Sequence, residues 1–394
     1  ITIDDVTTRD MDDALSIEHT EGGYRLGIHI TDVASCVEVD SPLDREAKSR
    51  ATSLYFPEGT YHMFPESLSE EKLSLREGEP RRTLSILFEV DKLFEIQSQT
   101  IVPSWIEVKR RLSYEEVDHA LELEHGDEFL LYQIAMSCEA HRLAHGGMNI
   151  PKRDVSIALS NRGQLSETDF TLSELDERGP ARSLIGEMMI LANHCFAHYA
   201  QSHSLPLLFR TQEDPDESKQ PDLSVIPAGP AQDYAMRQGL KRSEITTSAA
   251  RHSTLGLDAY AQVTSPIRRY GDLVNQRQLL SFLRENHASY TDEMLEHSIT
   301  ETSEANQRAR LLTRETKRFW LLKYLKKKKG RKEKIQATVL RDDMKNYLVE
   351  LEEIYIPAYL KTGTKLQRGD IVELDITAVD PRYDYLKLTF QKKY

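Results

Sequence analysis

Five aspartates crowd the start of this chain: Asp4, Asp5, Asp10, Asp12 and Asp13 lie within ten positions. At neutral pH, carboxylates this close together repel one another, bind protons more tightly than usual, or share a hard cation. Two divalent ions held about 4 Å apart by such a cluster can activate a water and stabilise the leaving oxygen of a phosphodiester. The cluster therefore predicts metal-dependent phosphodiester chemistry, with an acidic loop that binds nothing as the alternative.

The spacing of these acids excludes an EF-hand, because no register supplies the oxygen ligands, the glycine and the final glutamate of a calcium loop. The residues after the acids predict a hairpin instead. Residues 14–17 and 24–30 have strand-like patterns, and Glu21, Gly22 and Gly23 lie between them as a turn. The first strand emerges directly from the acids, so we expect a sheet to hold the carboxylates in place.

A second feature begins at Ser265, a favourable helix N-cap, followed by Pro266, a favourable first helical residue. The sequence predicts that a helix starts there, with Arg268 and Arg269 in its first turn. Two arginines in a first helical turn are repelled by the positive end of the helix dipole, which costs energy unless an anion binds there. Free backbone N–H groups beside a guanidinium form a suitable site for a phosphate oxygen. The alternative is that the arginines pair with carboxylates such as Asp272. Combined with the aspartates, this segment favours phosphodiester chemistry.

The remainder of the chain mixes predicted helices and strands. One helix is expected at 184–199, where apolar residues form a single stripe and Glu187 and Asn193 flank it, a position typical of solvated or capping residues. Basic residues concentrate at 323–334, which usually indicates a solvated helix end. From 335 to 390, short alternating segments at 336–340, 347–351, 371–374 and 386–390 predict a small β-barrel.

The composition is that of an ordinary soluble protein, since 394 residues with 39% hydrophobic content allow a large core and more than one domain. No apolar run approaches the roughly 20 residues of a membrane helix, so we expect no membrane contact. Three cysteines are too few for a disulfide framework, which favours a reducing, cytoplasmic location. The formal charge of −13 argues against indiscriminate coating of nucleic acid.

The chain opens inside the acidic cluster, so we expect that an N-terminal portion has been removed or not included. An organellar location is the alternative if that portion held a transit segment.

Seven segments together carry a resemblance. Residues 2–4, 10–14, 29–33, 41–44, 52–55, 75–78 and 264–270 resemble, in the same order, the catalytic domain of the ribonuclease II / ribonuclease R (RNB) exoribonuclease family. The separations of six, two and one residues between Asp4, Asp10, Asp12 and Asp13 are far more specific than any single motif. The similar stretch covers most of the chain.

The resemblance implies an α+β catalytic domain of mixed sheets and helices over residues 1–332, followed by a small all-β OB-fold barrel that binds RNA over residues 333–394. It also implies that the family's N-terminal RNA-binding modules are absent from this chain. The alternative for the barrel is a structural or protein-contact module. Its candidate base-stacking residues are Tyr347, Tyr355, Tyr359, Tyr383 and Tyr385.

The activity implied by the resemblance is a processive 3′-to-5′ hydrolytic exoribonuclease that degrades single-stranded RNA to nucleoside 5′-monophosphates by a two-metal-ion mechanism. Magnesium is the expected metal, with manganese as the alternative, and we expect a monomer. By position, Asp4, Asp10, Asp12 and Asp13 match the aspartates that hold the metals. Asp10, Asp12 and Arg268 match catalytic residues, with Asp12 the most sensitive and Arg268 on the phosphate.

Three further residues match RNA-binding positions of the family. Tyr55 and Tyr114 match aromatics near the RNA 3′ end, and a base stacked on tyrosine gains about 1–3 kcal/mol without reading sequence. Glu187 matches a carboxylate that senses ribose, because DNA would leave such an acceptor unpaired. Without the family, ordinary packing is the simpler interpretation of both tyrosines. Ile150 falls near a family phenylalanine that sandwiches the terminal bases, so the clamp is expected to be weaker here.

Two functions of other classes stay open. A catalytically silent relative could bind RNA as a regulator, and the retained aspartates and Arg268 argue against it. A metal-dependent phosphoesterase acting on DNA or small phosphoesters would use the same acids and arginine. Preference for RNA over DNA of the same sequence separates the last case from an exoribonuclease.

Overall fold

The computed structural model describes residues 1–150, 153–160, 169–176 and 179–394. Its α-helices are α1 (Pro42–Arg50), α2 (Tyr114–Leu121), α3 (Asp127–Ala144), α4 (Pro180–Ser202), α5 (Pro230–Met236), α6 (Tyr270–Glu285) and α7 (Asp292–Gly330). Its first strands are β1 (Thr2–Asp4), β2 (Asp13–His19), β3 (Gly23–Thr31), β4 (Leu54–Phe56), β5 (Gly59–Tyr61), β6 (Pro80–Asp91), β7 (Ile96–Glu107) and β8 (Arg111–Ser113). The later strands are β9 (Asp154–Leu159), β10 (Phe170–Leu175), β11 (Phe209–Thr211), β12 (Glu244–Thr246), β13 (Ile335–Arg341), β14 (Tyr347–Leu351), β15 (Ile356–Leu360), β16 (Ile371–Asp380) and β17 (Tyr385–Lys393).

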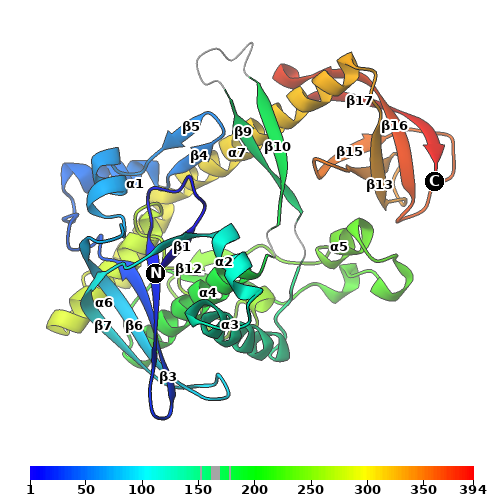
Figure 1. Ribbon diagram of the computed structural model, residues 1–394. Coiled ribbons are helices and arrows are strands. Elements are labelled where there is room, and N and C mark those ends of the chain that lie inside the picture. Colours follow the sequence, from blue (N-terminus) through cyan, green and yellow to red (C-terminus); the bar gives the residue numbers. More distant parts are fainter. Residues whose placement is uncertain (151–152, 161–168, 177–178) are drawn as a thin grey trace.

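A four-stranded antiparallel sheet, in the order β2-β3-β6-β7, organises the N-terminal part of the molecule (Figure 1). The predicted hairpin is confirmed, because β2 pairs with β3 along its whole length. Gly23 is required where β3 begins: its φ is +156°, and a Cβ there would lie 2.2 Å from the carbonyl oxygen of Val90. Leu26 and Ile28 of β3 share one core with Phe88 of β6 and Phe196 of α4.

Helix α4 confirms the predicted helix and extends it at both ends. The expectation that Glu187 and Asn193 are solvated or capping residues is wrong, since only 6% and 2% of their surfaces are exposed. A second face of the helix, outside its apolar stripe, is also buried, because the segment after Asp258 lies against it. There Asn193 accepts a hydrogen bond from the Val263 N–H at 2.8 Å. The spacing of apolar residues predicts only the apolar buried face of a helix, and it cannot predict a second face that is buried through polar contacts.

The predicted helix start at Ser265 is also wrong. Residues 265–269 form a turn in which the N–H groups of Arg268 and Arg269 donate to the Ser265 carbonyl oxygen at 3.2 and 2.9 Å. Helix α6 begins only at Tyr270, and its first-turn Asp272 accepts from the Ser265 N–H at 2.9 Å and from the Arg269 guanidinium at 2.6 Å. The arginines therefore precede the helix, and the predicted conflict with its dipole does not arise. For Arg269 the carboxylate-pairing alternative is the observed arrangement.

The C-terminal residues form a curled, five-stranded antiparallel sheet in the order β15-β14-β13-β16-β17. Four of these strands fall on the predicted alternating segments, and β15 is additional to them. Cα atoms of the two edge strands, β15 and β17, come within 8 Å of each other, so the sheet curls part of the way towards closure. Leu322 and Leu325 of α7 pack into the same core as Val339 and Leu374 of the sheet.

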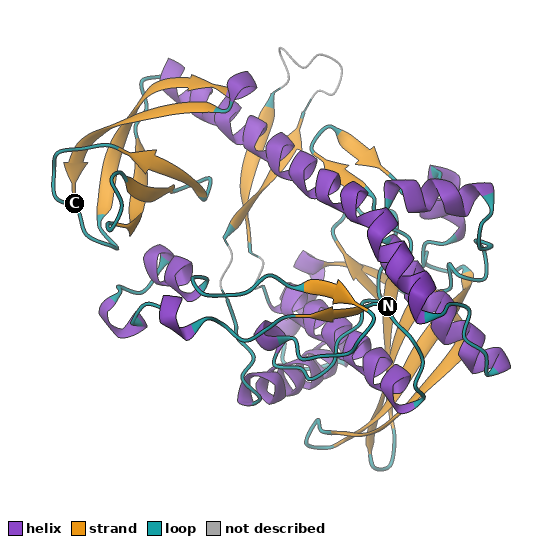
Figure 2. Cartoon of the chain, turned by 180° about the vertical axis from the view of Figure 1, so that it is seen from behind, coloured by secondary structure: helices purple, strands orange, loops and turns teal. Residues whose placement is uncertain are grey.

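Helix α7 is 39 residues long and runs diagonally from the N-terminal part of the molecule to the C-terminal sheet (Figure 2). Several basic residues near its end pair with carboxylates, for example Lys327 with Asp169 at 2.6 Å and Lys328 with Glu353 at 2.8 Å. None of the helices in the described part of the chain combines the length and apolar character needed to cross a membrane. Cys36, Cys138 and Cys195 are free thiols.

Candidate active site

The four motif aspartates are held by two strands and the loop between them. Asp4 ends β1, Asp13 begins β2, and Asp10 and Asp12 lie on the connecting loop with only 7% and 4% of their surfaces exposed. Met11 anchors that loop: its N–H donates to Ser74 Oγ at 3.0 Å, and its carbonyl accepts from the Leu75 N–H at 3.0 Å. The Met11 side chain is itself buried, so the loop between Asp10 and Asp12 is held in place from both its backbone and its side chain.

Asp10 faces residues from a separate segment, β4 and the stretch after β5. The Tyr55 hydroxyl donates to Asp10 Oδ2 at 2.5 Å, and the Nδ1 atom of His62 lies 3.8 Å from the same oxygen. The other ring nitrogen of His62 is 3.0 Å from Glu70. Tyr55 was selected from the sequence, whereas His62 was not, because a single histidine in a loop carries no local pattern.

Asp12 meets the turn that precedes α6. Its Oδ1 accepts from the Ile267 N–H at 2.9 Å, and its Oδ2 accepts from Arg268 Nε at 3.2 Å. A second nitrogen of the guanidinium, Nη2, donates to Ser265 Oγ at 2.8 Å, and the side chain stays 44% exposed. The turn thus aims Arg268 at the acidic loop while leaving part of its guanidinium accessible.

The electrostatics show how closely these carboxylates interact. Burial raises the pKa of Asp4 to about 6 against the opposing charges of Arg111 and Arg268. Burial likewise raises the pKa of Asp12 to about 7, although Arg268 and the Ile267 N–H favour its charged form. The pKa of Asp13 rises well above its usual range, first through burial and then through the charges of Asp4 and Asp12. The charges of the nearby arginines therefore do not offset the cost of burying these carboxylates.

Tyr114 joins the site through strand pairing. Strands β1 and β8 are parallel, with Asp4 opposite Ser113, and Ser113 caps the helix that begins at Tyr114. Burial, followed by the charges of Asp4 and Asp13, raises the pKa of the Tyr114 hydroxyl to about 12. The Arg182 guanidinium lies 4.1 Å from the centre of its ring, so one side of the ring is already in contact.

Glu187 of α4 pairs with an arginine of α3. Its carboxylate receives two hydrogen bonds from the Arg142 guanidinium, one of them from Nε at 2.8 Å. Both residues line a partly open cavity of about 890 Å³ between α3, α4 and the β6–β7 turn. Ile150, the position expected to weaken the base clamp, is half-buried.

Asn193, which the helix pattern predicted to be solvated or capping, instead makes three hydrogen bonds inside the protein. Its side chain donates to the Tyr260 hydroxyl at 3.1 Å and to Thr264 Oγ1 at 3.2 Å, and it accepts from the Val263 N–H at 2.8 Å. These hydrogen bonds hold α4 against the segment from Tyr260 to Thr264, which precedes the turn that contains Arg268. The residue therefore supports Arg268 from a distance.

The donor set suits hard divalent cations. Asp4, Asp10, Asp12 and Asp13 offer only carboxylate oxygens, the ligands that magnesium and manganese prefer. Burial raises the pKa of Asp4, Asp12 and Asp13, and a bound cation would stabilise their charged forms. Such an arrangement can position a phosphodiester between a cation site and Arg268.

Comparison with known proteins defines the family. Residues 1–285 match the RNB domain, and the chain belongs to the RNB-domain family. It is 33% identical over 391 residues to an uncharacterized ribonuclease of Synechocystis, an alignment that covers 98% of this chain and 58% of that protein. The chain thus spans little more than half of the length of this relative.

Solved structures share the fold. The chain is similar to Mycoplasma genitalium RNase R in complex with ribose-methylated single-stranded RNA, with a TM-score of 0.82, 19% identity, and coverage of 99% of this chain and 70% of that one. It is also similar to yeast Ssd1, a pseudonuclease, with a TM-score of 0.76, 20% identity, and coverage of 99% and 51%. The fold therefore occurs with and without nuclease activity.

Proposed function

We propose that this chain is the catalytic part of a 3′-to-5′ exoribonuclease that hydrolyses single-stranded RNA processively to nucleoside 5′-monophosphates. Membership of the RNB-domain family and similarity to a ribonuclease support the reaction class. The observation that carries the proposal is the contact between Asp12 and Arg268, which lie 256 residues apart and meet at 3.2 Å. This contact brings the buried carboxylates next to a partly exposed guanidinium, an arrangement that suits phosphodiester chemistry.

Two divalent ions, magnesium or alternatively manganese, would be held by Asp4, Asp10, Asp12 and Asp13. When bound, such ions acidify a water and neutralise charge on the phosphate. The Arg268 guanidinium has N–H groups beyond those that contact Asp12 and Ser265, and these can hold a phosphate oxygen. Asp10, Asp12 and Arg268 are the proposed catalytic residues.

RNA would contact the aromatic and polar residues around this cluster. The ring of Tyr55 is well placed for stacking, since the residue is 43% exposed while its hydroxyl is held by Asp10. Tyr114 offers the ring side that Arg182 leaves open. We assign ribose recognition to Glu187, whose carboxylate is oriented by Arg142. A 2′-hydroxyl could donate to it, whereas DNA has no such group.

The C-terminal sheet would serve as an OB-fold-like RNA-binding domain. We place the boundary between residues 1–332 and 333–394, in the short gap between α7 and β13. Among the candidate stacking residues, Tyr359, Tyr383 and Tyr385 are 64%, 83% and 51% exposed, whereas Tyr347 and Tyr355 pack against the sheet core. A monomer in the cytoplasm, or in an organelle if a transit segment is removed, stays our prediction.

The test is digestion of a 5′-labelled single-stranded RNA with magnesium, with EDTA, and by the Asp12→Asn variant, beside DNA of the same sequence. We expect shortening from the 3′ end that EDTA or Asp12→Asn abolishes and that DNA does not show. Equal cleavage of DNA would favour the general phosphoesterase. RNA that is bound and left intact would favour a silent, regulatory relative, a function that the similarity to a yeast pseudonuclease keeps open.

A further inference from the structure

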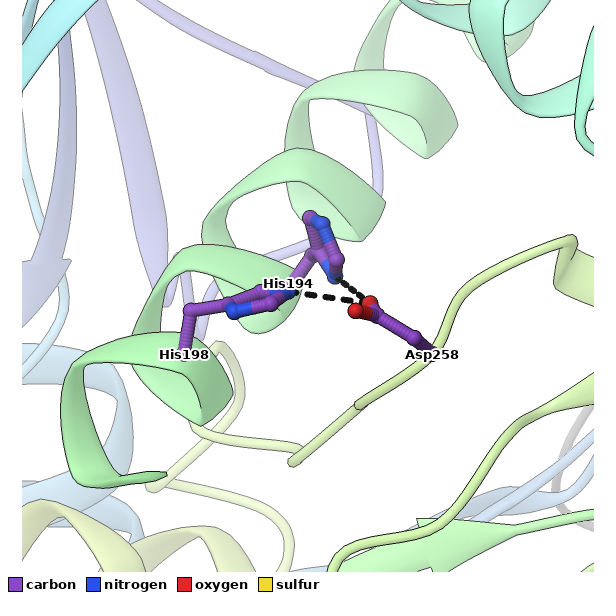
Figure 3. Close-up of side chains that lie close together, drawn as sticks. All are labelled: His194, His198 and Asp258. Carbon is purple, nitrogen blue, oxygen red and sulfur yellow. Dashed lines mark hydrogen bonds and ion pairs between the residues drawn. The ribbon is translucent and has the colours of Figure 1, made fainter. Parts of the chain in front are cut away.

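Two histidines and an aspartate converge at the rim of the cavity between α3 and α4. His194 and His198 are one turn apart on α4, and Asp258 lies on the facing segment, with all three side chains pointing toward one another (Figure 3). Each offers one ligand atom, and these atoms all lie within 4.8 Å of one another. Nothing in the proposed ribonuclease reaction uses these residues.

Each histidine has one hydrogen-bond partner, and the three side chains are close enough together to share an ion in place of those bonds. His198 Nε2 is 2.9 Å from Asp258 Oδ1, but His194 Nδ1 is 4.0 Å from that oxygen and 2.9 Å from the Ala259 carbonyl oxygen. The two imidazole rings are in contact, with their centres 4.4 Å apart and their planes nearly perpendicular. An exposed histidine–carboxylate pair by itself stabilises a protein very little.

The ligand chemistry selects a class of metal. Two imidazoles and one carboxylate are typical of zinc and neighbouring transition metals, whereas magnesium and calcium prefer sites made of oxygen alone. A histidine must be neutral to coordinate a metal ion, so binding at this site should weaken as the pH falls. Coordination through Nδ1 would replace the hydrogen bond that the Ala259 carbonyl oxygen accepts from His194.

We propose that His194, His198 and Asp258 form a binding site for a transition-metal ion of the zinc class, separate from the aspartate cluster. Three protein ligands would leave a coordination position for water. The ion would join α4 to the segment that begins at Asp258 and continues through Tyr260 and Val263, the partners of Asn193, to the Arg268 turn. Its direct consequence is therefore tighter packing of that segment on α4.

The probe is zinc chloride, titrated by calorimetry into the 394-residue chain in the presence of excess magnesium, which occupies oxygen-only sites. We expect one zinc ion per chain and a higher unfolding temperature with zinc. His198→Ala and Asp258→Asn should each weaken zinc binding by more than the roughly 10- to 100-fold lost with an outer-shell partner. His203→Ala, at the end of the same helix, is the matched control and should bind as the parent does.

His198 and Asp258 are accessible, with side chains 40% and 72% exposed, so the variants should fold, and their unfolding temperature without zinc should match that of the parent. The proposal is overturned if the parent chain binds no zinc under these conditions. It is equally overturned if His198→Ala binds zinc as tightly as the parent, since the ion would then use other ligands, such as His141 of α3 and His145 just after that helix. Neither readout depends on nuclease activity, so the result is independent of the proposed function.

Discussion

Replacing Asp4 by asparagine should stabilise the metal-free chain while abolishing its activity. In the folded chain, burial raises the pKa of Asp4 from the usual 3.8 to about 6. A carboxyl whose pKa is raised by folding binds its proton more tightly in the folded state, so its ionisation costs stability. That cost is absent below the unfolded pKa, grows as pH rises between the two values, and is constant above the folded pKa. Asparagine has nearly the same shape and carries no charge.

The magnitude can be worked out from the shift. A difference of about 2 pKa units corresponds to about 3 kcal/mol at 1.36 kcal/mol per unit. Asp4 interacts electrostatically with Asp10 and Asp13, so removing its charge also changes their ionisation and makes the net effect on stability smaller. We therefore expect Asp4→Asn to raise the free energy of unfolding by about 1 to 3 kcal/mol at alkaline pH, and by about half as much near pH 5.

Urea-induced unfolding in EDTA measures this free energy, at about pH 8 and about pH 5. The adjacent residue supplies a matched control: Asp5 accepts hydrogen bonds from the N–H and hydroxyl of Thr7, which lower its pKa. Asp5→Asn should therefore leave stability unchanged or reduce it, and should retain activity. The reasoning fails if Asp4→Asn is no more stable than the parent near pH 8, or if both substitutions stabilise equally.

Three further substitutions test other contacts. Tyr55→Leu should raise the KM for single-stranded RNA by the equivalent of about 1–3 kcal/mol, whereas Tyr55→Phe, which keeps the ring, should not; an equal rise in both would refute stacking. Glu187→Ala leaves the buried Arg142 without a carboxylate partner and should cost about 3–5 kcal/mol in urea unfolding, part of which Arg142→Met should recover in the double variant. Asn193→Ala leaves the Val263 N–H without its acceptor and should cost about 1–3 kcal/mol by the same measurement, with a lower kcat through the Arg268 turn; unchanged values would remove its supporting role.

Local sequence patterns predicted those elements whose contacts are close in the chain. The hairpin β2–β3 follows from alternation around Gly22 and Gly23, and four strands of the C-terminal sheet follow from the same rule. The helix start near Ser265 failed although the local signals were good. Asp272 takes the Ser265 N–H, and Asp12 takes the Ile267 N–H, so both backbone donors are satisfied in a turn rather than in a helix.

By itself, the sequence determined the acid spacing, the reaction class that the acids suit, and the family, because all of these reside in residue types and their order. Only the tertiary structure decided what surrounds the acids. The contacts of Asp10 with His62, of Asp12 with Arg268, and of His198 with Asp258 join distant segments. The burial of Glu187 likewise depends on a separate element, because Arg142 of α3 pairs with its carboxylate. No local pattern encodes such contacts, because they form only when separate elements pack together and exclude water from polar groups that must then pair.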